Sequence, residues 1–372
     1  MLESLGSPVQ SDAEKPHPHK IDRLARAFNL ELSSRPPILG GWLAAPDHIQ
    51  TLTGCSEDEY WDDSFHWGLE AERVLGSDGV LDVVEPVTRG DFRIIDGQTI
   101  EIRAGYTVES VLAEIETTPT PKEFRENFDA EAEYAQYVAE HKAKQAQCDD
   151  ILWCPPDWEV VPKALWYLEF GYDAALMTLA LHPDRYRKLI QFSAERGRLR
   201  ATLIARAIRE GIHSGALLTG EDLCSQRGPL VSPDYLRREY FPLVEYTLEP
   251  LLEVGAKIVW HCDGNYRPLL DDVLACNISG LQGFQQECGM DLEWIVERRT
   301  RDGDPLLIFG PLSVTTTLPH GTPDDIRAEV RRAMSLCRDK ASLVFFSSNT
   351  ITPDVPLENI QTFWQTVIES TW

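Results

Sequence analysis

The chain has 372 residues, of which 43% are hydrophobic and 26% are charged, so we expect a soluble globular protein with a large core. Its formal charge of −25 at pH 7 disfavours a nucleic-acid partner and an anionic membrane surface. No apolar run approaches the roughly 18 residues of a membrane span. The eight cysteines show no CxxC pair and no disulfide-framework spacing, so we expect reduced thiols in a cytoplasmic protein.

The predicted elements begin after a polar, proline-containing tail over residues 1–20. The first two predicted strands are residues 36–45 and 79–86. Residues 56–76, between these strands, have helical spacing and begin with a capping-box pattern. The chain therefore starts with one strand–helix–strand unit, which is typical of an α/β protein.

The next segment interrupts this alternation. Residues 91–105 contain two alternating runs around an Asp-Gly pair, which indicates an inserted β-hairpin. Residues 121–146 predict a charged, exposed helix, and residues 151–156 predict a third strand that ends in two prolines. Helical spacing then continues over residues 159–211, and we expect the aromatic residues there to pack in the core.

From residue 214 onward, strands and helices alternate regularly. Five more strands are predicted, at residues 214–223, 257–264, 280–285, 305–313 and 342–351. Eight apolar strands, nearly all followed by a helix, predict a (β/α)8 TIM-type barrel with an N-terminal extension and a β-hairpin insertion. An open doubly wound sheet is less favoured because no G-x-G-x-x-G follows the first strand. We expect a single barrel domain over residues 21–372.

In such a barrel, functional groups gather where the strands end at their carboxyl termini. The fifth predicted strand ends in His261, Cys262 and Asp263, and the fourth ends in Glu221 and Asp222. Side chains alternate along a strand, so His261 and Asp263 are expected to face the barrel mouth while Cys262 packs against a helix.

Three interpretations of this cluster remain open. His261 and Asp263 can form an acid–base pair, or they can bind a metal with Glu221 as a third ligand. Three protein ligands with one open position are typical of a catalytic zinc site. Alternatively, His261 is a buried histidine whose hydrogen bonds are satisfied by a neighbouring carboxylate.

The chain resembles the uroporphyrinogen decarboxylase superfamily, and within it the cobalamin-dependent methyltransferase branch. The resemblance is carried by the stretches GEDLCSQRGPLVSPDYLRREYFPLVEYTL, GAKIVWHCDGNYRPLLDDVLACNISGLQGFQ, GPLSVTTTLPHGTPDDIRAEVRRAM and ITPDVPLENIQTF. A fainter match lies in RPPILGGWLAAPDHIQTLTGCSEDEYWDD. The resemblance spans most of the chain apart from residues 91–150, and it also implies a (β/α)8 barrel.

The resemblance implies a particular chemistry as well. Zinc enzymes of this branch carry His-x-Cys after the fifth strand and a second Cys after the eighth, and their zinc activates a thiol that takes a methyl group from a corrinoid protein. This chain keeps His261, but Asp263 and Asn349 stand where the cysteines would be. Any metal here would therefore have nitrogen and oxygen ligands, which suit zinc less exclusively.

We therefore expect an enzyme that moves a methyl group between a small methylated or methoxylated compound and a corrinoid on a partner protein. The chain contains no Asp-x-His-x-x-Gly corrinoid signature of its own. The expected catalytic and metal-binding residues are His261, Asp263 and Glu221, with zinc as the first choice of divalent metal. The expected substrate-binding residues are Gln285, Asn349 and Asp222. The resemblance also implies a homodimer.

Two alternatives keep the same fold. One is a corrinoid-independent decarboxylase or lyase that acts on a small organic acid through the His261–Asp263 pair. The other is a barrel that binds a small molecule without catalysis. Decarboxylation of a porphyrinogen is disfavoured because no arginine lies between Arg35 and Arg73 to grip a polycarboxylate.

Overall fold

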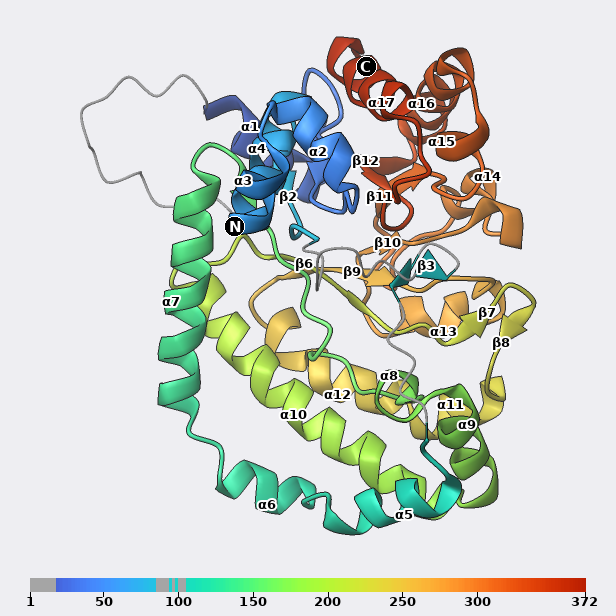
Figure 1. Cartoon of the computed structure of the whole chain (residues 1–372). Helices are drawn as coiled ribbons and strands as arrows, with labels where there is room; N and C mark the ends of the chain where they lie inside the picture. The colour runs from blue at the N-terminus through green and yellow to red at the C-terminus, as the bar shows by residue number, and fades with distance from the viewer. Residues whose placement is uncertain (1–17, 85–93, 96–97, 100–104) are drawn as a thin grey trace.

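The computed structural model of the chain describes residues 18–84, 94–95, 98–99 and 105–372. Eight parallel strands form its centre (Figure 1). They are β1 (Leu39–Gly40), β2 (Gly79–Val80), β5 (Leu152–Trp153), β6 (Ala216–Gly220), β9 (Lys257–His261), β10 (Gly280–Gln282), β11 (Leu306–Leu312) and β12 (Ala341–Ser347). Each overlaps one of the eight predicted strands, and β12 begins one residue before its predicted range. Neighbouring strands pair in parallel in two sheets, β1-β2-β5 and β6-β9-β10-β11-β12.

Backbone contacts join the two sheets at both edges. At one edge, Ile38 forms a parallel bridge with Phe345, and the Phe345 amide donates to the Pro37 carbonyl at 2.8 Å. At the other edge, the Asp157 amide donates to the Leu218 carbonyl at 2.9 Å. The eight strands therefore follow one another in chain order around a ring, and the predicted (β/α)8 barrel is confirmed.

Strand alternation separates the barrel interior from its outer shell. Val259 packs inside the barrel with apolar residues of the other strands, whereas Ile258, Trp260 and Cys262 belong to the core between strands and helices. Helix α1 (Pro18–Phe28) covers the end of the barrel where the strands begin: its buried Leu24, Ala27 and Phe28 pack against the interior cluster. Any accessible site in the barrel must therefore lie at the opposite end, where the strands finish.

Helices surround the ring of strands (Figure 1). They are α2 (Pro46–Thr53), α3 (Glu57–Asp62), α4 (Ser64–Leu75), α8 (Tyr167–Phe170), α9 (Tyr172–Leu181), α10 (Pro183–Arg209), α11 (Pro233–Glu239), α12 (Phe241–Leu252), α13 (Leu270–Ala275), α14 (Leu292–Ile295), α15 (Thr317–His320), α16 (Pro323–Cys337) and α17 (Leu357–Glu369). The predicted capping box is present at the start of α3, where Ser56 and Glu59 exchange hydrogen bonds.

The predicted helix over residues 159–211 is wrong at its amino-terminal end. Residues 154–166 have no helical structure, and helices α8, α9 and α10 follow them. Pro162 lacks a backbone donor and Trp166 has a φ of 50°, so neither fits a helix interior. The expectation that the aromatic residues pack in the core is confirmed for Phe170 and Tyr186. Trp166 and Tyr167 are only partly buried: they pack against the core and also line a cavity.

The insertion between β2 and β5 is partly described. Strands β3 (Ile94–Ile95) and β4 (Gln98–Thr99) pair antiparallel, as the predicted hairpin requires, and the rest of that prediction lies outside the described residues. Helices α5 (Val108–Thr117), α6 (Pro121–Glu126) and α7 (Ala130–Cys148) then wrap around α10 (Figure 1), so the predicted helix over 121–146 is two helices. The predicted tail lies outside the described residues except for residues 18–20, which begin α1.

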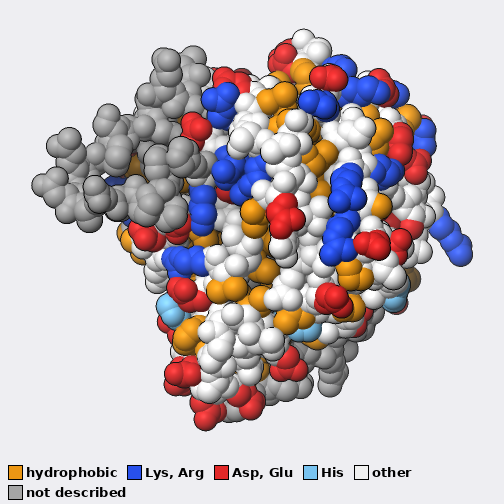
Figure 2. Space-filling model, turned by 90° about the horizontal axis from the view of Figure 1, so that it is seen from above, with side chains coloured by type: hydrophobic (Ala, Val, Ile, Leu, Met, Phe, Trp, Pro, Cys, Tyr) orange, Lys and Arg blue, Asp and Glu red, His pale blue; other side chains and the backbone are white. Residues whose placement is uncertain are grey.

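All eight cysteines are described, and each is buried with a free thiol. None of the described helices combines the length and apolar character that crossing a bilayer requires. Figure 2 shows acidic and basic side chains interspersed over the face of the molecule seen from above. The excess of negative charge is therefore not gathered into one patch on that face.

Candidate functional site

His261 is the last residue of β9 and lies at the open end of the barrel with only 7% of its surface exposed. Its Nε2 atom is 3.6 Å from Asp222 Oδ1 and 3.9 Å from Asp263 Oδ1. One ligand atom from each of these three residues lies within 4.8 Å of the others. The structure therefore brings together His261, Asp263 and Asp222.

Further hydrogen bonds hold both carboxylates in place. Asp222 accepts from the Asp263 backbone amide at 2.8 Å and from the Tyr167 hydroxyl at 3.1 Å. Asp263 Oδ2 accepts from Asn349 Nδ2 at 2.7 Å. Burial raises the pKa of Asp263 to about 6, and the neighbouring Asp222 charge acts in the same direction, against the lowering effect of His261. Asp263 can therefore carry a proton near neutral pH more readily than an ordinary carboxyl.

Two glycines allow the backbone to approach His261 closely. A Cβ atom at Gly220, at the end of β6, would lie 2.0 Å from the His261 carbonyl oxygen. A Cβ atom at Gly283, just after β10, would lie 2.4 Å from His261 Nδ1. Both glycines also have positive φ, of 151° and 77°, which other residues rarely adopt. Any side chain at either position would displace the imidazole or the strand that carries it.

Glu221 lies apart from this cluster, although it precedes Asp222 in the sequence. Its carboxylate accepts hydrogen bonds from the backbone amides of Ala164 and Leu165 at 2.8 and 2.9 Å. Burial raises the pKa of Glu221 to about 7, and these two backbone hydrogen bonds act in the opposite direction. In the three-residue group close enough to share a metal ion, Asp222 takes the place that the sequence suggested for Glu221.

The two predicted substrate-binding amides both contact the protein. Asn349, beyond the end of β12, donates to Asp263 as described above. Gln285, after β10, accepts from the Gly264 amide at 2.8 Å through its Oε1 atom. Both side chains therefore tie other strands to the segment that follows His261, and their role towards a substrate stays a prediction.

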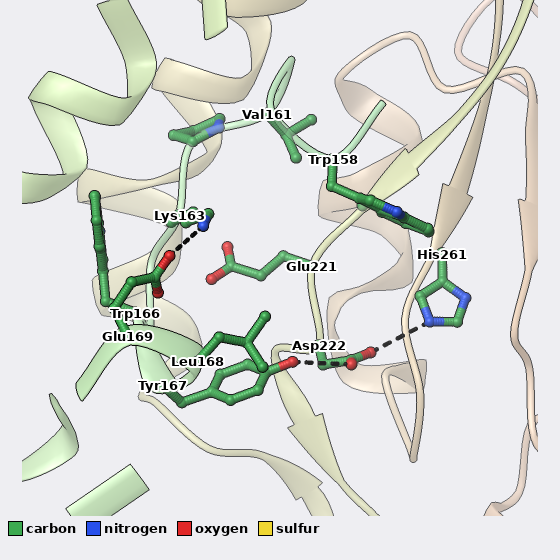
Figure 3. Close-up of a pocket in the computed structure, with 12 residues that line it drawn as sticks. Trp158, Val161, Lys163, Trp166, Tyr167, Leu168, Glu169, Glu221, Asp222 and His261 are labelled. Carbon is green, nitrogen blue, oxygen red and sulfur yellow. Dashed lines mark hydrogen bonds and ion pairs between the residues drawn. The ribbon is translucent and has the colours of Figure 1, made fainter. Parts of the chain in front are cut away.

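A cavity of about 260 Å³ opens beside Asp222 and His261 (Figure 3). Its aromatic wall is formed by Trp158, Trp166 and Tyr167, and the Trp158 ring meets the His261 ring edge-on at a centroid distance of 5.5 Å. Sequence analysis missed this wall because Trp166 and Tyr167 were assigned to a helix and Trp158 was assigned to no element. The two prolines at the end of the third strand and Pro162 were the signals that could have indicated a loop there.

Apart from His261, Lys163 is the one basic side chain among the residues that line the cavity, and it forms an ion pair. Lys163 contacts the carboxylate of Glu169, which also lines the cavity (Figure 3). Glu221 and Asp222 add two further carboxyl groups. A ligand with several carboxylates would therefore find no free guanidinium or ammonium group among the lining residues.

The donor set of the cluster is chemically suited to a divalent metal. It offers one imidazole nitrogen and two carboxylate oxygens in a largely buried setting, and carboxylates near one another are favoured by an intervening cation. No thiolate is among these three residues, so the set is harder than a zinc site with cysteine ligands. The same groups can also exchange protons with a ligand in the cavity.

The family model described as "Uroporphyrinogen decarboxylase (URO-D)" matches residues 169–370, which is more than half of the chain. Among solved structures, a methyltransferase from Methanosarcina mazei is similar to the chain, with 16% sequence identity and a TM-score of 0.55. The similarity covers 94% of this chain and 98% of that protein. No curated protein sequence matches. At this identity, the structural likeness shows a shared fold.

Proposed function

The chain belongs to the uroporphyrinogen decarboxylase family, and we propose that it is a methyltransferase-like enzyme. It moves a methyl group between a small methylated or methoxylated compound and a corrinoid carried by a partner protein. The observation that carries this proposal is the placement of His261, Asp222 and Asp263 beside a small cavity at the open end of the barrel. The similarity of the whole chain to a methyltransferase supports the same choice within the family.

The size and charge of the cavity narrow the proposed substrate. The cavity of about 260 Å³ has room for a small molecule. Aromatic walls suit an apolar methylated group, and the Lys163–Glu169 pair leaves no free positive charge for a polycarboxylate. These features favour a small compound over the tetrapyrrole that gives the family its name.

Methyl transfer requires a group that assists the atom losing its methyl. When the bond from carbon to oxygen or sulfur breaks, this atom keeps the electron pair and is stabilised by a proton or by a Lewis acid. A divalent metal held by His261, Asp222 and Asp263, with zinc expected first, would supply the Lewis acid. Asp263, whose pKa is raised to about 6, is positioned to hold a proton beside the cavity.

One observation also favours a second candidate function. Asp263 and Glu221 have raised pKa values of about 6 and 7, which lie in the range that acid–base catalysis uses at neutral pH. A corrinoid-independent decarboxylase or lyase would use such groups without a metal. In that case the acid would need to carry few carboxylates, because Lys163 is the single ammonium group among the lining residues and is already paired with Glu169.

Metal analysis and a methyl-transfer assay separate these functions. The protein is purified without added chelator, its metal content is measured, and free methylcobalamin is supplied with a series of small thiols and phenols. We expect about one divalent metal per chain and consumption of methylcobalamin that His261→Ala abolishes. His320→Ala, which changes an exposed histidine on α15, is the matched control.

Two results would contradict the methyltransferase proposal. Less than about 0.2 metal per chain, together with intact methylcobalamin, would favour the decarboxylase or lyase. Ligand binding that survives His261→Ala, with no turnover of any compound tested, would favour a non-catalytic binding barrel.

A further inference from the structure

Gln282 is a fully buried polar residue at the end of β10, directly beside His261 in the sheet. Its Oε1 atom contacts His261 Nδ1. Its Nε2 atom donates to the carbonyl oxygens of Ser347 at 3.1 Å and Ser348 at 3.0 Å, at the end of β12. A single amide therefore connects the imidazole on β9 to the backbone at the end of β12, three strands away in the sheet.

These contacts determine which nitrogen of His261 carries a proton. Backbone carbonyls can only accept, so the two serine carbonyls require the amide nitrogen of Gln282 to face them. The amide oxygen is then the atom that meets His261 Nδ1, and because this oxygen can only accept, Nδ1 must be the donor. In the neutral imidazole, Nε2 is left with its lone pair.

The lone pair on Nε2 faces the two carboxylates of the site. Asp222 and Asp263 approach this atom to 3.6 and 3.9 Å, and neither carboxylate can donate to it when ionised. The lone pair of His261 Nε2 and the carboxylate oxygens of Asp222 and Asp263 thus lie close together. That arrangement is favourable only when a cation or a substrate proton lies among them.

We propose that Gln282 is the positioning residue of this site: it holds His261 as the Nδ1–H tautomer, so that Nε2 is presented as a ligand or proton acceptor. The importance of this tautomer for methyl transfer rests on the proposed function. The tautomer itself does not, because it follows from hydrogen bonds within the protein. Gly283 is part of the same arrangement, since only a residue without a Cβ allows the chain to pass so near Nδ1.

The tautomer is measured by nitrogen-15 NMR of the full chain labelled in its histidines, with His261 assigned from the signals lost in His261→Gln. At a pH where the ring is neutral, we expect a protonated Nδ1 and an unprotonated Nε2. Gln282→Leu removes the acceptor and should move the ring towards the Nε2–H form that free histidine favours in water. Gln282→Glu keeps an acceptor and should retain Nδ1–H.

Zinc affinity gives a second readout that a merely structural role would not change. Loss of an outer partner of a ligating histidine typically weakens metal binding about 10- to 100-fold, so we expect that loss for Gln282→Leu and a smaller one for Gln282→Glu. Gln286→Leu removes a nearby amide that contacts Pro311 and Glu329 rather than His261, and it should leave both readouts unchanged. Thermal unfolding of each variant checks that it is folded.

The two hypotheses fail in different ways. An unchanged His261 spectrum in folded Gln282→Leu would overturn the role of Gln282, whatever the enzyme does. If the tautomer shifts in Gln282→Leu but the protein binds no zinc and transfers no methyl group, the role of Gln282 stands and the proposed function is refuted.

Discussion

Asn349 donates a hydrogen bond of 2.7 Å to Asp263, and it thereby links the segment that follows the eighth strand to the segment that follows the fifth. These are the two positions where the resemblance to zinc methyltransferases places cysteines. Where the resemblance implies a pair of thiolate ligands, this chain has an amide and a carboxylate that contact each other directly. Asp263 can still bind a metal through its other oxygen, whereas Asn349 is occupied as a donor.

Replacing these two residues together should change the metal preference of the site. Asp263→Cys combined with Asn349→Cys supplies two soft thiolates next to His261, so we expect higher zinc affinity and a thiolate-to-metal absorption band with Co²⁺. Asn349→Cys alone is the control, since it adds one thiol and leaves Asp263 without its donor. No gain in zinc affinity for the double variant would mean that the two positions do not converge on one metal.

Tyr167 should contribute to the site through Asp222 rather than through a ligand. Its hydroxyl donates to Asp222 Oδ2 at 3.1 Å, so Tyr167→Phe frees that carboxylate to rotate away from His261. We expect metal affinity to fall about 10-fold with little change in the melting temperature. Tyr134→Phe removes a similar hydrogen bond to Glu210, the residue after the end of α10, and equal effects of the two variants would refute a specific role for Tyr167.

The arrangement of strands was predictable because the apolar runs end at polar residues. In the fifth strand, the apolar run Ile258 to Trp260 is followed at once by His261 and Asp263. Period-two alternation also assigned Cys262 to the outer core. Gln282 was not predictable, because its role depends on the register that places it beside His261. The positions of Glu221 and Asp222 were equally hidden. Glu221 is held by the backbone amides of Ala164 and Leu165, which lie more than 50 residues earlier in the chain. Asp222 is held by the Tyr167 hydroxyl and the Asp263 amide.

Glu221 should make the stability of the protein fall as the pH rises. Burial raises its pKa from 4.5 to about 7, so the folded state binds a proton that the unfolded state has already released between these values. The stabilisation is fully present below pH 4.5 and is lost as the pH rises through 7, by about 3 kcal/mol in total. Glu221→Gln cannot titrate, so its stability relative to the wild type should increase between pH 5 and pH 8 in urea unfolding. A difference that does not vary with pH would contradict the raised pKa.

His213 should have the opposite effect from Glu221: it should make the stability of the folded protein fall as the pH is lowered below 6.5. It is buried, its Nδ1 accepts from the Gly215 amide at 3.0 Å, and its Nε2 has no hydrogen-bond partner within the described part of the chain. Burial and, to a smaller extent, the charge of nearby His141 lower the pKa of His213 from 6.5 to about 3. Below pH 6.5 the unfolded chain therefore takes up a proton that the folded protein excludes, and stability falls by about 2 kcal/mol between pH 6.5 and pH 5.

The variant His213→Asn tests this dependence, because asparagine can still accept from Gly215 through its side-chain oxygen but does not titrate. Its unfolding free energy should be lower than that of the wild type at pH 8, owing to lost packing, but should decline less steeply towards pH 5. His320→Asn, at an exposed position, should follow the wild-type curve. Parallel curves for the wild type and His213→Asn would show that His213 is protonated in the folded protein, most simply through a proton acceptor reaching the unpartnered Nε2.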